Sequence, residues 1–129
     1  MSEPSFESLL SPLPLKAALL TDAEGVVLIR AGGASEDDLG LVELQRMAVT
    51  YAQTAETASK LKLGKSTTST AFYEKGTVVH VSVAPLVLTL LADADANVGL
   101  LLDAAPALAA ACEPMRAAQE QQGVRATFS

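Results

Sequence analysis

The sequence predicts an α/β fold with α+β topology, in which one five-stranded, mostly antiparallel sheet carries helices on both faces. The apolar patterns along the 129 residues follow the order helix, strand, strand, helix, strand, strand, strand, helix. Residues 86–92 are apolar at nearly every position, which is typical of a strand that is covered on both faces. The length and the lack of a repeat predict a single domain over 1–129, with an ordered core of about 5–121 and a tail at 123–129.

Apolar spacing and turn residues define the N-terminal elements. Residues 5–13 carry leucines and a phenylalanine at helical spacing, so we expect a short first helix that prolines end. Two strands, Leu15–Thr21 and Val26–Ala31, flank a four-residue turn that ends in Gly25, which is the pattern of a hairpin. A long helix from about Asp37 to Leu61 follows.

Three strands and a last helix complete the chain. Ser66–Tyr73 is rich in Thr and aromatic residues, Thr77–Val83 alternates, and Leu86–Ala92 is the doubly buried strand. The last helix has two candidate starts, because Asn97 and Asp103 are both good N-cap residues. A helix that begins at Asn97 contains a proline in its interior, where a kink is expected.

Composition excludes several classes of function. The net charge is −6, from nine basic and fifteen acidic residues, which disfavours nucleic-acid binding. One cysteine cannot form an internal disulfide, which favours a reducing, intracellular location. The longest apolar run, Val83–Ala92, is about half the length of a membrane span, and no targeting or lipidation signal is visible. We therefore expect any membrane attachment to come through a partner.

No motif in the sequence indicates a catalytic, metal or cofactor site. His80 is the only histidine and lies mid-strand, and Cys112 lies on the apolar face of the last helix, so both are interpreted as structural. Residues 64–67 resemble the end of a P-loop but follow a helix and lack its first glycine. The polar run 93–97 offers too few oxygens for a calcium loop. An enzyme with a pocket that the sequence does not reveal is the competing interpretation.

The long helix and the strand after it suggest a surface for protein contact. The helix carries a stripe of small and apolar residues, and further apolar residues lie outside that stripe, so it has more apolar surface than one sheet needs. The Ser- and Thr-rich strand 66–73 is expected at a sheet edge, where another chain can pair. The predicted partner interface is Leu41, Leu44, Ala48, Tyr51, Ala55, Ala58, Ser66, Thr68 and Thr70. We expect Ala48 and Ala55 to be accessible in the free subunit; a helix sunk into its own core is the alternative.

The order of elements and the junction 90–101 (LLADADANVGLL) resemble the roadblock/dynein light chain superfamily, which has a profilin-like shape. Three stretches, 59–66 (SKLKLGKS), 78–81 (VVHV) followed by 84–87 (APLV), and 96–101 (ANVGLL), are similar to the MAPK-scaffold (MEK-partner) subunits of the Ragulator complex. The resemblance covers about Leu15 to Ala118.

This resemblance implies a non-enzymatic scaffold without a cofactor. Such subunits pair through the second helix and third strand with a second roadblock-type subunit, which joins two sheets into one of ten strands. The implied partners are Rag-type GTPases and MAP-kinase pathway kinases, with support for TOR-complex signalling. The implied location is the cytosolic face of late endosomes and lysosomes, reached through a lipidated partner. The alternative within the superfamily is a homodimeric small-GTPase regulator or a dynein light chain.

Overall fold

The fold is seen in a computed structural model that describes residues 10, 13–32, 40–60, 68–74, 76–83 and 85–118, without the side chains of 41 and 58–60. The elements are β1 (Leu15–Thr21), β2 (Val27–Gly32), α2 (Leu41–Lys60), β3 (Thr68–Tyr73), β4 (Gly76–Val83), β5 (Leu86–Ala92) and α3 (Val98–Ala111). This order agrees with the prediction. Most of the predicted first helix, the predicted start of the long helix at residues 37–39 and the C-terminal tail lie outside the described residues.

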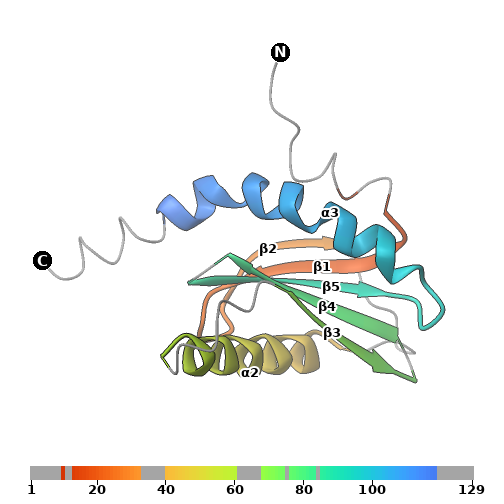
Figure 1. Cartoon of the computed structure of the whole chain (residues 1–129), viewed down its shortest axis with the longest axis horizontal. Coiled ribbons are helices and arrows are strands. Elements are labelled where there is room, and N and C mark those ends of the chain that lie inside the picture. Colours follow the sequence, from red (N-terminus) through yellow and green to blue (C-terminus); the bar gives the residue numbers. More distant parts are fainter. Residues whose placement is uncertain are drawn as a thin grey trace, which may run out of the picture.

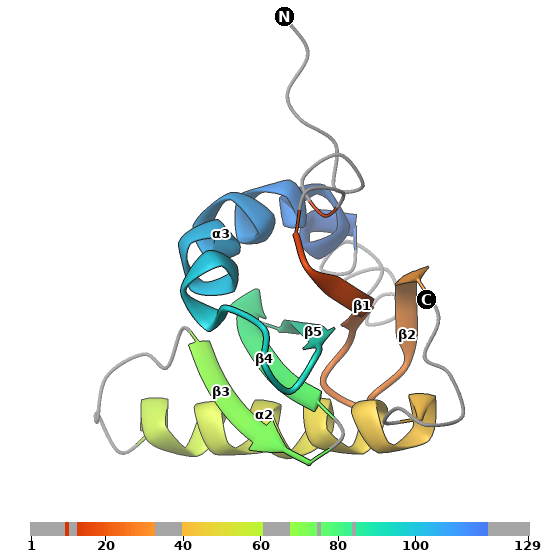
Figure 2. The ribbon, with the colours of Figure 1, turned by 90° about the vertical axis from the view of Figure 1, so that its right-hand side faces the viewer.

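The five strands form one antiparallel sheet in the order β2-β1-β5-β4-β3, so β5 is central and β2 and β3 are the edges. α2 lies under one face and α3 lies over the other (Figures 1 and 2). Every residue of β5 is buried, as its continuous apolar run predicted. The predicted fold class is therefore confirmed.

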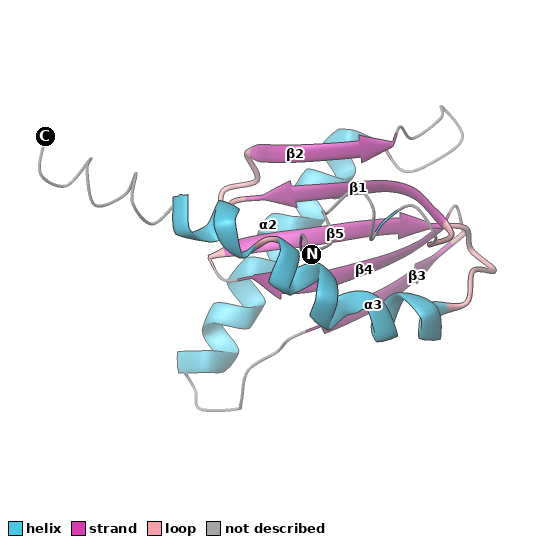
Figure 3. Cartoon of the chain, turned by 90° about the horizontal axis from the view of Figure 1, so that it is seen from above, coloured by secondary structure: helices cyan, strands magenta, loops and turns pink. Residues whose placement is uncertain are grey.

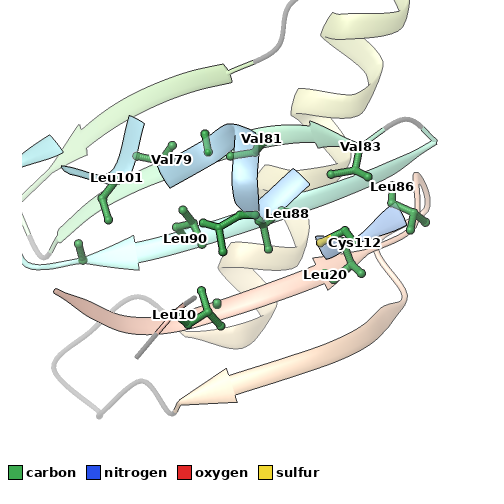
Figure 4. Packing of buried hydrophobic residues seen from close by; sticks show 14 residues of the cluster. Leu10, Leu20, Val79, Val81, Val83, Leu86, Leu88, Leu90, Leu101 and Cys112 are labelled. Carbon is green, nitrogen blue, oxygen red and sulfur yellow. The ribbon is translucent and has the colours of Figure 1, made fainter. Parts of the chain in front are cut away.

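The two faces of the sheet hold separate parts of the core. On the α3 side, Leu101 and Leu108 of α3 are fully buried against alternate residues of β4 and β5. Cys112 belongs to the same cluster, and Figure 4 shows it next to Leu20 of β1. Leu10, from the region of the predicted first helix, is buried there too. The α2 side is lined by the other alternate positions, Ala17, Leu19, Val78, Val87 and Leu91.

The turn between β1 and β2 has the predicted hairpin chemistry. The Asp22 carboxylate accepts hydrogen bonds from the backbone N–H groups of Glu24 and Val26 at 3.0 and 2.9 Å. Gly25 has φ +90°, a conformation that side-chain-bearing residues rarely adopt. The Gln45 side chain of α2 donates to the Gly25 carbonyl at 3.0 Å, so this turn is tied to α2 as well as closed on itself.

Asn97, and not Asp103, begins the last helix. Its side-chain oxygen accepts a hydrogen bond from the Gly99 N–H at 3.0 Å, so it is the N-cap of α3. Pro106 therefore lies inside the helix. Proline has no N–H to donate to the carbonyl of Leu102, four residues earlier. Because Pro106 is exposed, water can hydrate this carbonyl instead.

Candidate partner interface

The predicted interface stripe on α2 points mainly into the protein's own core. Leu44, Ala48 and Tyr51 have exposed fractions of 2%, 0% and 7%, and Ala48 and Tyr51 pack with Val87 of β5. Ala55 is half-buried against the same group. The expectation that Ala48 is accessible in the free subunit is wrong, because the small side chains let α2 approach its own sheet closely. The side chains of Leu41 and Ala58, and all of Ser66, lie outside the described residues.

His80 lies on β4 and faces α2. Its ring stacks on Tyr51, with centroids 5.2 Å apart and an interplanar angle of 10°. Burial lowers the pKa of His80 to about 4, so the imidazole is neutral at physiological pH. Its Nε2 and the Oγ1 of Thr89, its cross-strand neighbour, are buried and have no hydrogen-bond partner among the described residues. His80 thus supports α2 packing, which agrees with the structural interpretation.

The accessible part of α2 is the flank that carries Thr50 and Thr54, next to the predicted stripe. This flank is not part of the interface that the sequence predicted. Gln45 and Val49 face the β1–β2 turn, because Gln45 bonds to Gly25 and a Cβ on Gly25 would lie 2.9 Å from Val49. Helical geometry places Thr50 and Thr54 on the opposite flank, and both are exposed. The sequence signal for this flank was the pair of threonines spaced by four residues.

The hydroxyls of these two threonines are turned back onto their own helix. Thr50 donates to the Arg46 carbonyl at 3.1 Å, and Thr54 donates to the Thr50 carbonyl at 3.0 Å. Their hydrogen-bonding capacity is thus partly used inside α2. Small side chains with bonded hydroxyls form a surface that a second helix can approach closely at little desolvation cost.

β3 is an edge strand, as its composition predicted. It pairs only with β4, so its other side is free within the described chain (Figure 3). Thr68 and Ser69 are exposed, and Thr70 is half-buried. α2 runs beneath the sheet from the β2 side to the β3 side (Figure 2). The C-terminal part of α2 and the β3 edge therefore lie on the same side of the molecule.

The described residues hold no cluster of three or more His, Cys, Asp or Glu side chains that could bind a metal ion. In the polar loop after β5, Asp93 forms an ion pair with Lys16 at 3.1 Å and Asn97 caps α3. Cys112 is 1% exposed, and burial raises the pKa of its thiol to about 11. Among the described helices, none combines the length and apolarity needed to cross a bilayer.

Sequence comparison places these features in a known family. Residues 6–118 match the family described as "Mitogen-activated protein kinase kinase 1 interacting". The "Ragulator complex protein LAMTOR3-B" of Xenopus laevis is 33% identical over 88 residues, which is 68% of this chain and 70% of that protein. The "Ragulator complex protein LAMTOR3 homolog" of Dictyostelium discoideum is 29% identical over 84 residues, 65% of this chain and 63% of that protein.

Solved structures share this fold. MglB of Myxococcus xanthus superposes with a TM-score of 0.69 at 14% identity, covering 85% of this chain and 89% of that one. A roadblock/LC7 domain from Streptomyces avermitilis superposes with a TM-score of 0.64 at 16% identity, covering 84% and 92%. The sequence relatives support a scaffold or adaptor role, and the structures show the fold. The chain belongs to the mitogen-activated protein kinase kinase 1 interacting family and has the roadblock fold.

Proposed function

We propose that this chain is a non-enzymatic scaffold subunit that pairs with a second roadblock-type subunit through the β3 edge and the Thr50–Thr54 flank of α2. The observation that carries the proposal is the position of the β3 edge relative to α2. A strand edge without a neighbour in the described chain lies on the same side as the C-terminal part of α2, and this helix carries the exposed Thr50 and Thr54. Such an edge is a template for strand pairing.

The pairing geometry follows from the sheet. Two β3 edges that meet antiparallel join two five-stranded sheets into one of ten strands, with both α2 helices on the same face. The Thr50–Thr54 flank then meets the partner's α2. Backbone hydrogen bonds along β3 supply register, and the helix contact supplies apolar burial. In this proposal α2 contributes its Thr50–Thr54 flank to the interface, and the buried stripe that includes Ala48 and Tyr51 does not take part. Thr68 and Thr70 of β3 stay in the interface.

The family relatives suggest the assembly that such a pair enters. We infer a Ragulator-type complex on the cytosolic face of late endosomes or lysosomes, held there by a lipidated partner subunit. In that setting the pair supports Rag-type GTPases, TOR-complex signalling and MAP-kinase pathway kinases. The second candidate is another roadblock module, a homodimeric small-GTPase regulator or a dynein light chain, in which the free β3 edge would pair two copies of this chain.

The test is association of the whole chain, alone and co-expressed with each roadblock-type subunit encoded in the same genome. Light scattering after size exclusion should give a dimer with itself or with one of them. Thr54→Arg should reduce that dimer strongly while the melting temperature of the free chain stays nearly unchanged, since Thr54 is exposed.

Ala107→Arg is the matched control, because Ala107 is exposed on α3, on the opposite face of the sheet. It should leave the dimer intact. A chain that stays monomeric alone and with every roadblock-type subunit would overturn the proposal. So would a dimer that Thr54→Arg and Ala107→Arg affect equally.

A further inference from the structure

The backbone of β3 presents every second residue to the free edge of the sheet. Only two residues separate β3 from β4, and the register sets Tyr73 opposite Gly76. In a two-residue hairpin the closing pair exchanges both of its backbone hydrogen bonds, and hydrogen-bonded pairs alternate with non-hydrogen-bonded pairs from there on. The N–H and C=O groups of Tyr73 therefore point at β4. The backbone groups that point away from β4, toward the edge, are those of Thr68, Thr70 and Phe72.

The side chains of these three residues project from the face of the sheet that is opposite α2. Phe72 lies in one cross-strand row with Thr77 and Ala92, and Ala92 belongs to the core cluster on the α3 side. Thr68 and Thr70 project from the same face, because side chains alternate along a strand. Thr77 and Ala92 are fully buried, whereas Phe72 is 71% exposed, the highest value among the large apolar side chains that the structure describes. The row thus ends at the edge with an uncovered aromatic ring.

A strand that pairs with this edge extends the row by one position. It bonds to the outward N–H and C=O groups of Phe72 and places one of its own side chains beside the ring, since directly opposite residues have Cβ atoms about 5 Å apart. Thr77 already flanks the ring on the β4 side. The unpaired backbone and the uncovered ring of Phe72 thus call for the same occupant, the edge strand of another subunit.

The sequence of β3 shows which side chain suits the position opposite Phe72. When two copies of β3 meet antiparallel, only one alignment pairs all three outward residues with one another. It sets Thr70 opposite Thr70 of the second copy, and Phe72 opposite Thr68 of the second copy. Threonine pairs and pairs of an aromatic with a β-branched residue are favourable cross-strand neighbours. An acidic side chain opposite Phe72 would instead lose hydration against the ring without gaining a counter-ion.

We propose that Phe72 is a second contact of the pairing surface, on the face of the sheet opposite α2, and that it selects a roadblock-type edge strand with a β-branched side chain opposite its ring. This inference rests on the pairing proposed above and adds a residue and a face that the pairing proposal does not use. Thr50 and Thr54 of α2 contact the partner on one face of the joined sheet, and Phe72 contacts it on the other. The joined sheet is therefore held from both faces.

Dissociation constants of Phe72 variants test the selection. The full chain is paired with itself or with the roadblock-type subunit that gives a dimer in the association test, and the constant is measured by analytical ultracentrifugation. Phe72→Ser should raise it about tenfold or more, because the apolar contact is lost, and Phe72→Leu should raise it less. Val26→Ser is the matched control, since Val26 is 56% exposed and precedes β2 at the opposite edge of the sheet. It should leave the constant unchanged, and the melting temperature of each free variant should stay close to that of the unmodified chain.

Hydrogen exchange of backbone amides, followed by NMR in the free and the paired chain, separates this inference from the pairing proposal. The amides of Thr70 and Phe72 should exchange rapidly in the free chain and about tenfold or more slowly in the pair, whereas that of Ala71, which points at β4, should be slow in both. If these two amides are protected but Phe72→Ser and Val26→Ser pair equally well, Phe72 has no role and the pairing proposal stands. If they stay unprotected in the dimer, or if no dimer forms, the edge does not pair and both proposals are overturned.

Discussion

The ring of His80 on β4 lies parallel to the ring of Tyr51 on α2, with centroids 5.2 Å apart. This contact joins the long helix to β4. It also places an imidazole where water cannot hydrate its charged form, which is why its pKa falls to about 4. The packing of α2 is thereby linked to pH.

Acid should destabilise the chain through His80. The unfolded imidazole has a pKa near 6.5 and the folded one about 4, so the unfolded state binds the proton first as the pH falls. Stability is full above pH 6.5 and is lost progressively down to about pH 4, by roughly 3 kcal/mol in total. His80→Phe keeps an aromatic ring beside Tyr51 but cannot titrate. Urea unfolding at several pH values should show a flatter pH dependence for that variant; identical slopes would contradict this role.

Ala48→Arg should unfold the chain rather than merely impair association. Ala48 has no exposed surface, so a guanidinium there must displace Tyr51 or Val87 or stay buried without a counter-ion. The expected loss in unfolding free energy is on the order of 3 kcal/mol. Gln53→Arg, on the exposed side of the same helix, should change it by about 0.5 kcal/mol or less. Chemical denaturation of both variants decides this, and equal stability would mean that α2 is not packed as described.

The cap of α3 is expected to contribute measurably. Asn97→Ala removes the acceptor of the Gly99 N–H and should lower the unfolding free energy by about 1 kcal/mol. Asn97→Ser restores a side-chain acceptor and should recover most of that loss. Thermal melts of the two variants provide the measurement. If Asp103→Ala were the costlier change, the helix would begin at the later position.

The single thiol should be unreactive in the folded chain. Cys112 is 1% exposed and its pKa is raised to about 11 from an ordinary 9.0, which lowers the thiolate fraction at neutral pH about a hundredfold. Iodoacetamide should therefore modify the native chain very slowly and the urea-unfolded chain rapidly, as followed by mass spectrometry. Fast modification of the native chain would show that the end of α3 opens readily.

Local chemistry in the sequence determined the elements and their order. The continuous apolar run of β5 predicted a strand that is covered on both faces, the turn residues 22–25 predicted a hairpin, and the Ser- and Thr-rich composition of β3 predicted an edge. These predictions hold because periodicity and turn chemistry depend on neighbours along the chain. The resemblance to the roadblock superfamily added the fold family, which the comparisons support.

Only the tertiary structure decided which side of α2 meets the sheet and where α3 begins. The stripe through Leu44, Ala48 and Tyr51 is the same on a helical wheel whether it faces a partner or the chain's own β5, because periodicity defines a face and not its neighbour. Likewise, Asn97 and Asp103 are equally good caps in isolation. Packing of Leu101 into the core fixes the earlier start, since burial of an apolar side chain outweighs an interior proline on the solvent side.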